Sequence, residues 1–104
     1  MQNKVLSMLG LAARSGKVVS GEFSTEKAVR TGHAFLVIVS EEASDNTKKA
    51  FSNLTDFYHV PIWFYGTKEA LGNAIGKEFR ASCAVTDENL AKAVESKLLS
   101  EKRQ

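Results

Sequence analysis

The chain has 104 residues, of which 43% are hydrophobic and 25% are charged. This length and composition are typical of one globular domain with a real core, and they exclude a disordered chain. The formal net charge is only +2, which by itself does not identify a partner.

The positive charge is concentrated toward the amino end. Residues 1–40 contain five basic and two acidic groups, whereas residues 41–104 contain nine basic and ten acidic groups. Such an excess is expected where one edge of a protein meets a polyanion. The longest apolar run, Phe35–Val39, is far shorter than the roughly 20 residues that span a bilayer. With no signal-peptide pattern and a single cysteine, we expect a cytoplasmic protein without a membrane partner.

The first half of the chain alternates between helical and extended patterns. Apolar residues at helical spacing predict a helix over residues 3–13, which Ser15-Gly16 ends. A short strand over residues 17–20 follows, and Gly21 turns the chain into a second helix over residues 22–31. Residues 35–40 are apolar on both faces and rich in β-branched side chains. That pattern is typical of a central strand covered by helices on both sides.

The alternation continues to the carboxyl end. Ser44 or Asn46 can cap a third helix, whose apolar face is predicted to carry Ala50, Phe51, Leu54, Phe57 and Tyr58. A strand over residues 62–65 and a helix between Thr67 and Gly76 come next; the Gly-x-x-x-Gly spacing there favours close packing and a helix end. A strand over residues 81–85 then precedes a last helix, and residues 99–104 are expected to form a polar tail. This order, αβαβαβαβα, predicts one α/β domain over residues 3–98 with helices on both faces of one sheet.

Residues suited to catalysis or metal binding are scarce. Cys83 lies in an apolar strand, which predicts a buried, unreactive thiol. His33 and His59 share no ligand-spaced motif with it, and the glycine motifs of phosphate-binding loops are missing from the sequence. We therefore predict no enzymatic activity, no metal, no cofactor and no small-molecule substrate.

The helix that follows Gly21 is the most informative element. The free N–H groups of its first turn can receive a phosphate. Phe23, Lys27 and Arg30 share one face, on which cations can meet phosphates and the aromatic ring can stack on an unpaired base. The pattern equally allows a solvated face with Phe23 folded into the core. The opposite face can pack inward through Thr25, Ala28 and Val29.

Two further loops can lie beside this helix start. The first follows the central strand, where open α/β sheets present their binding crevice. Its Glu41 and Glu42 could accept hydrogen bonds from base amino groups, or could be solvated acids before a helix. The second, Lys77–Arg80, holds Phe79 between cations, and this ring is either a core anchor or a stacking surface.

The run from Gly21 to Ala43, with Val60-Pro61 and the segment Lys68–Gly76, resembles the signature of kink-turn-binding ribosomal proteins. This is the "seven-Ae" family of the large ribosomal subunit, with thirty-e and Gadd45-like relatives, and the nearer resemblance is to its small bacterial YlxQ-type members. The resemblance covers about residues 3–98. It implies a three-layer α-β-α sandwich with a mixed four-stranded sheet. It also implies a non-catalytic protein that binds kink-turns or related internal loops of RNA.

The family's contact motif, Gly-x-Asn-Glu-x-x-Lys, falls on the start of the second helix. Gly21 and Lys27 match it, whereas Phe23 and Ser24 replace the asparagine and glutamate that read guanine edges in the family. The motif therefore does not predict strict kink-turn specificity. The loop before the last strand corresponds to the family segment that covers a flipped-out nucleotide, which makes Phe79 the candidate for that contact.

The leading hypothesis is a monomer that binds a bent, structured RNA of ribosomal or translation-associated origin. Its predicted phosphate contacts are Arg14, Lys17 and Lys27, and its predicted base-edge contacts are Ser24, Glu41 and Glu42. Phe23 and Phe79 are the predicted stacking rings. Gly21 and Arg80 complete the set of predicted RNA-binding residues. The alternative is a Gadd45-like protein-interaction module, whose partner would dock on the two phenylalanine rings.

Overall fold

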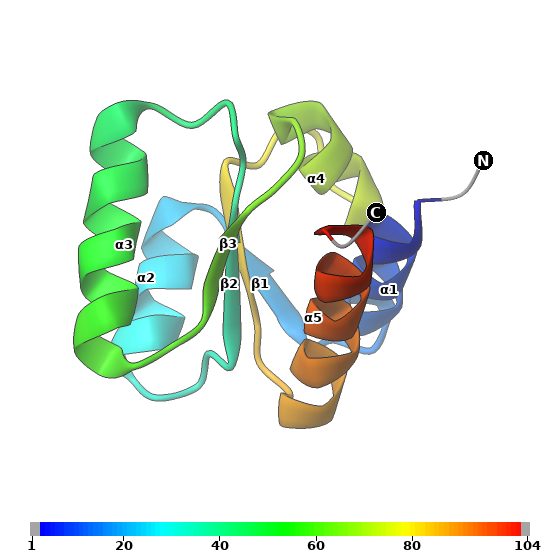
Figure 1. The fold of residues 1–104 in the computed structure, drawn as a ribbon, viewed down its shortest axis with the longest axis horizontal. Coiled ribbons are helices and arrows are strands. Elements are labelled where there is room, and N and C mark those ends of the chain that lie inside the picture. Colours follow the sequence, from blue (N-terminus) through cyan, green and yellow to red (C-terminus); the bar gives the residue numbers. More distant parts are fainter. Residues whose placement is uncertain (1–2, 103–104) are drawn as a thin grey trace.

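A computed structural model describes residues 3–102, which form a three-layer α-β-α sandwich (Figure 1). The sheet contains four strands in the order β1-β4-β2-β3. The strands β2 and β3 are parallel, whereas β4 is antiparallel to both of its neighbours, β1 and β2. In chain order the elements are α1 (Lys4–Arg14), β1 (Val18–Ser20), α2 (Glu22–Arg30), β2 (Leu36–Val39), α3 (Asp45–Tyr58), β3 (Ile62–Phe64), α4 (Lys68–Ala74), β4 (Ser82–Val85) and α5 (Glu88–Lys102).

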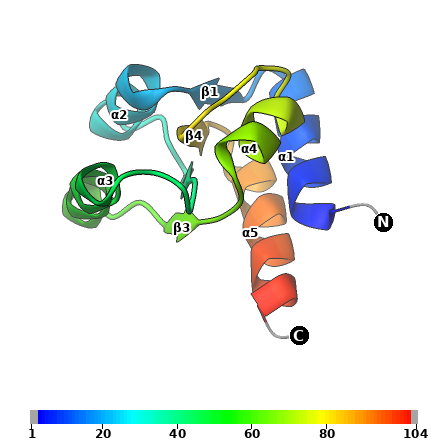
Figure 2. The same ribbon diagram turned by 90° about the horizontal axis from the view of Figure 1, so that it is seen from above.

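The predicted sandwich and mixed sheet are confirmed. The helices α1, α4 and α5 cover one face of the sheet, and α2 and α3 cover the other (Figure 2). Alternate residues of β2 point to opposite faces, so Leu36 and Ile38 pack under α1 and α5, while Val37 and Val39 pack under α2 and α3. Every residue of β2 and β4 is buried, which makes these two strands the centre of the core.

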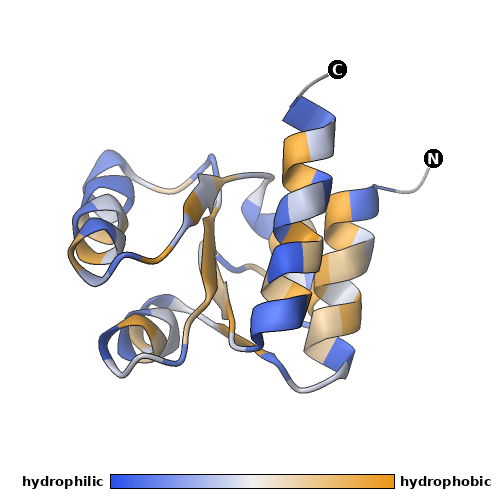
Figure 3. Cartoon of the chain, turned by 60° about the horizontal axis from the view of Figure 1, so that its bottom comes forward, coloured by the Kyte–Doolittle hydropathy of each residue, from blue (hydrophilic) through white to orange (hydrophobic). Residues whose placement is uncertain are grey.

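Hydropathy follows the same layers. The strands are hydrophobic along most of their length, and α2, α3 and α5 carry hydrophilic residues on their outer surfaces, whereas α1 is hydrophilic mainly at its two ends (Figure 3). Side-chain oxygens cap four of the helices: Asn3 accepts from the Leu6 N–H, Ser44 from that of Thr47, Thr67 from that of Ala70, and Asp87 from that of Leu90. Ser44 is thus the cap of α3, rather than Asn46.

The buried face of α3 differs from the predicted one. Phe51 and Thr55, one turn apart, face the sheet, while Ala50 and Phe57 are exposed. The Thr55 hydroxyl is satisfied inside the core because it donates to the Phe51 carbonyl at 2.7 Å. A buried, bonded threonine therefore takes the place that the pattern assigned to an aromatic ring.

The predicted polar tail is wrong for residues 99–102, because α5 continues to Lys102. This last turn is held against β3 by its side chains. The Tyr65 hydroxyl donates to the Glu101 carboxylate at 2.9 Å, and the Lys102 ammonium lies 5.8 Å from the centre of the Trp63 ring. The expected end of the tail, residues 103 and 104, lies outside the described residues.

Cys83 lies in β4 and is fully buried. Loss of water around the thiol raises its pKa to about 12, and a hydrogen bond with the Ile38 backbone lowers it by less. We therefore expect the native thiol to resist alkylation by iodoacetamide at about pH 8 and to react once urea unfolds the chain. Because the pKa is raised in the fold, stability should decline as the pH rises above the thiol's ordinary value. Equal alkylation rates for the native and unfolded protein would contradict this prediction.

Candidate nucleic-acid interface

One edge of the sheet collects loops from distant parts of the chain. The strands β1, β2 and β3 all run opposite to β4, so their carboxyl ends meet where β4 begins. We call this edge the rim and define it as residues 20–21, 40–42, 66–68 and 77–81. It lies along the top of the molecule in Figure 1. The predicted neighbours of the α2 start thus do lie at the same edge.

Backbone hydrogen bonds hold the rim together. The Gly21 N–H donates to the Ser82 carbonyl at 3.0 Å, and the Ser40 N–H donates to the Ala81 carbonyl at 2.8 Å. A side-chain bond adds to them, because Arg80 Nε donates to Ser20 Oγ at 3.1 Å. The loop that carries Phe79 is therefore fixed beside the junction of β1 and α2.

Gly21 leaves the start of α2 open. Its backbone angles, φ 90° and ψ 158°, belong to a region that side chains other than glycine rarely adopt. A Cβ placed on Gly21 would meet no atom within 4 Å, and among the described side chains none caps the helix. The first N–H groups of α2 are consequently available to an anion.

The exposed face of α2 carries the predicted aromatic ring. Phe23 is 79% exposed, which settles the alternative that the sequence left open. Thr25, Ala28 and Val29 are buried against the sheet, as expected from their spacing. An exposed phenylalanine of this degree places a large apolar surface in water, next to the open helix start.

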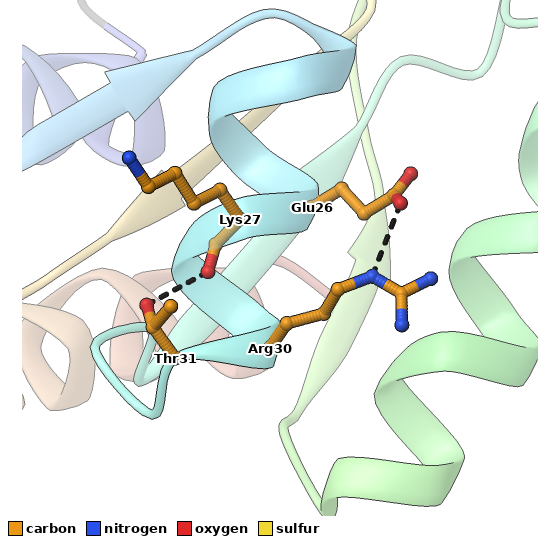
Figure 4. Close-up of polar contacts among 4 residues, drawn as sticks. All are labelled: Glu26, Lys27, Arg30 and Thr31. Carbon is orange, nitrogen blue, oxygen red and sulfur yellow. Dashed lines mark hydrogen bonds and ion pairs between the residues drawn. The ribbon is translucent and has the colours of Figure 1, made fainter.

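Lys27 and Arg30 were expected to share one face, but the structure separates their charged groups. Arg30 Nε donates to Glu26 at 3.1 Å, and Figure 4 shows the Lys27 side chain on the other side of the helix. Within residues 3–102 the ion pairs are Arg30–Glu26 and Lys92–Glu88. The ammonium group of Lys27 therefore has no internal carboxylate partner.

An open groove runs between α2 and the edge strand β1. Its volume is about 570 Å³, and the side chains that matter most for its chemistry are Lys17, Phe23, Ser24, Lys27, His33 and Thr86. The sequence pattern placed the first four in the candidate site but not His33 or Thr86. Nothing in the spacing of a loop histidine and a post-strand threonine signals that they line the same groove.

Glu41 and Glu42 serve the fold of the rim. Glu41 Oε2 accepts from the Gly66 N–H at 3.2 Å, and Glu42 Oε1 accepts from the Lys68 N–H at 2.8 Å. Each carboxylate thus holds the loop between β3 and α4 beside the loop after β2. One oxygen of each acid is occupied by this positioning role, which the sequence did not reveal.

Arg14 lies apart from the other predicted site residues. It ends α1, before β1 begins, and so stands away from the rim. A Cβ on Gly10 would come within 3.3 Å of a guanidinium nitrogen of Arg14 and 2.9 Å of the Ala74 carbonyl oxygen. Its side chain therefore runs back along α1 toward α4 and does not line the groove.

Several kinds of site can be assessed from the described part of the chain. Residues 3–102 contain no group of three or more His, Cys, Asp or Glu side chains that could hold a metal ion. No helix within this range has the length and apolar character needed to cross a membrane. The rim and the groove are therefore the features from which a function can be argued.

Comparisons with known proteins agree with this geometry. The family described as "Ribosomal protein L7Ae/L30e/S12e/Gadd45 family" matches residues 3–95. The RNA-binding protein YlxQ of Bacillus subtilis is 44% identical over 84 residues, which are 81% of this chain and 84% of that protein. The large ribosomal subunit protein eL30 of Tetrahymena thermophila is 37% identical over 82 residues, covering 78% and 79%.

A solved structure from Bacillus halodurans, described as that of a protein with unknown function, has nearly the same fold. Its TM-score is 0.90 at 36% identity, and the alignment covers 93% of this chain and 98% of the other. The arrangement of layers and strands is thus shared with a relative of almost the same length.

The position of Phe79 depends on a glycine in α4. A Cβ on Gly72 would overlap the carbonyl oxygen of Glu78, and the Lys77 N–H donates to the Gly72 carbonyl at 2.8 Å. We expect Gly72→Ala to lower the free energy of unfolding by about 1–3 kcal/mol, because the loop over residues 77–80 must move.

Urea unfolding followed by Trp63 fluorescence measures the change in stability. The exposed neighbour Asn73, substituted as Asn73→Ala, is the matched control and should be nearly neutral. Equal stability of the two variants would show that the loop does not press on α4.

Proposed function

The chain belongs to the ribosomal protein L7Ae/L30e/S12e/Gadd45 family, and from this membership we propose that it is a non-catalytic protein that binds a structured RNA. Its relatives include an RNA-binding protein YlxQ and a protein of the large ribosomal subunit, so an RNA of the ribosome or of translation is the proposed partner. The observation that carries the proposal is the open start of α2 at Gly21, with unpaired Lys27 and exposed Phe23 beside it. The protein is proposed to act as a monomer in the cytoplasm.

Phosphate groups are the proposed ligands of the rim. The free N–H groups of α2 attract an anion, and the absence of a Cβ at Gly21 lets an RNA backbone come close. Arg80 is held by bonds from Nε to Ser20 and from a terminal nitrogen to the Phe79 carbonyl, at 3.1 and 2.8 Å. A guanidinium fixed in this way presents its remaining donors without losing further side-chain entropy.

Unpaired bases are the proposed ligands of the aromatic rings. Phe23 is 79% exposed and Phe79 is 62% exposed, and stacking on a base removes such rings from water. Ser24 and the second oxygens of Glu41 and Glu42 remain candidates for hydrogen bonds to base edges. Because Phe23 replaces the asparagine of the family motif, we propose a bent internal loop in which stacking supplies part of the recognition.

A protein partner docking on the two phenylalanine rings would be the Gadd45-like alternative. The unpaired lysine and the uncapped helix start favour a polyanion over an apolar protein surface. The RNA-binding experiments below separate the two alternatives. If the protein were a protein-interaction module, replacing Lys27 and replacing a distant lysine would have the same effect on the Kd for RNA.

The Lys27→Ala variant should bind RNA more weakly, because one phosphate contact is lost. A contact of about 1 kcal/mol raises the Kd about fivefold. Fluorescence anisotropy with a labelled hairpin that contains a kink-turn internal loop measures the effect. Lys92→Ala on α5 removes the same charge from an exposed helix on the other face of the sheet and should leave the Kd unchanged. An equal Kd for both variants would refute the assigned role of Lys27.

Binding should also weaken steeply with salt, because phosphate contacts release counterions. If about four phosphates are neutralised, the Kd should rise about 50- to 150-fold between roughly 50 and 200 mM salt. A series of gel-shift titrations with the same hairpin measures the slope. A Kd that does not change with salt would count against phosphate recognition.

A further inference from the structure

We propose that the groove between α2 and β1 is a nucleotide subsite that holds the ribose–phosphate backbone of an RNA strand and prefers ribose to deoxyribose. This inference rests on the proposed function and extends it away from the start of α2. The subsite would take a single-stranded segment next to the nucleotides that meet Gly21 and Phe23.

The groove has the size and charge of such a site. Its volume of about 570 Å³ is within the range of pockets that hold small ligands. Val19 and Ala28 supply apolar lining, while Lys17 and Lys27 contribute ammonium groups from the β1 side and from α2. Its lining includes no carboxylate, so the charge in the groove is positive only.

Both lysines are available to an outside anion. The ion pairs formed by residues 3–102 involve Arg30 and Lys92, which are outside the groove. A phosphodiester is therefore the natural counterion of Lys17 and Lys27. With both ammonium groups lining one groove, a phosphodiester bound there would place an adjoining sugar against the groove wall.

We assign the tautomer of His33 from the hydrogen bonds of Thr31. The Thr31 hydroxyl donates its one proton to the Lys27 carbonyl at 2.8 Å, a bond drawn in Figure 4. The same oxygen lies 2.8 Å from His33 Nδ1, so with its proton assigned to the Lys27 carbonyl it accepts from the tautomer that carries a hydrogen on Nδ1. In the neutral ring the proton-free nitrogen is then Nε2. His33 is exposed and lines the groove.

A ribose hydroxyl can supply a hydrogen-bond donor for His33 Nε2. The 2′-OH can donate its one proton to this nitrogen and accept from the hydroxyl of Thr86 in the same groove. A deoxyribose offers no such donor. One hydrogen bond of ordinary strength corresponds to a preference for ribose of about threefold to tenfold.

The direct test is an NMR titration of the ¹⁵N-labelled protein with the dinucleotide UpU and with its 2′-deoxy counterpart. We expect UpU to shift the amide resonances of Val19, His33 and Thr86 and to bind about threefold to tenfold more tightly than the deoxy form. The exposed variant His33→Phe should lose this preference while retaining binding. No shift in the groove, equal affinities for the two dinucleotides, or an unchanged preference in His33→Phe would overturn the subsite.

A second measurement separates this inference from the proposed function. The labelled kink-turn hairpin is prepared with single 2′-deoxy substitutions in its unpaired strand, and its Kd is measured with wild type and His33→Phe. One of these 2′-deoxy substitutions should raise the Kd of the hairpin for the wild type but not for His33→Phe. If the hairpin binds and every substitution acts equally on both proteins, the proposed function stands and the subsite fails. If UpU shifts the groove but the hairpin does not bind, the subsite stands and the proposed function fails.

Discussion

The hydrogen bonds from Gly21 to Ser82 and from Ser40 to Ala81 are the interactions on which the functional surface depends. They join the loops after β1 and β2 to the loop before β4, segments that are far apart in sequence. Because these bonds use the backbone, they place few demands on the side chains at the rim. Phe23 and Lys27 can therefore stay exposed and unpaired without a cost to the fold. The side chains that line the groove beside α2 are likewise not needed to hold the rim together.

The acidic pair of the rim shows how a residue can serve a binding surface without being its ligand. Glu41 and Glu42 receive N–H groups from the neighbouring loop and so fix the path of the chain toward α4. Close packing at Gly72 then determines where Phe79 stands. Glycines, carboxylates and backbone hydrogen bonds fix the positions of the positive and aromatic groups, which themselves stay exposed. This arrangement suits a preformed RNA-binding surface.

The sequence predicted the order of the elements, the central place of the strand over residues 35–40 and the buried side of α2, because periodicity reports which face of an element is apolar. It did not place Arg30, since spacing cannot tell that its guanidinium turns to Glu26. The mixed character of the sheet came from the family resemblance, because alternating elements alone are also compatible with a parallel sheet. The strand order was not predicted and is a finding of the structure. The bond between Thr31 and His33, and with it the role assigned to the groove, depends on the return of the chain after α2 and has no signature in the sequence.

The central claim is that RNA covers the rim and the exposed face of α2, and hydrogen–deuterium exchange of the protein with and without the kink-turn hairpin tests it most directly. The account predicts slower exchange in peptides that span residues 20–33 and 77–82, with little change in α3 and α5. Protection confined to α5, on the other face of the sheet, and to β3, the edge strand farthest from β1, would contradict it.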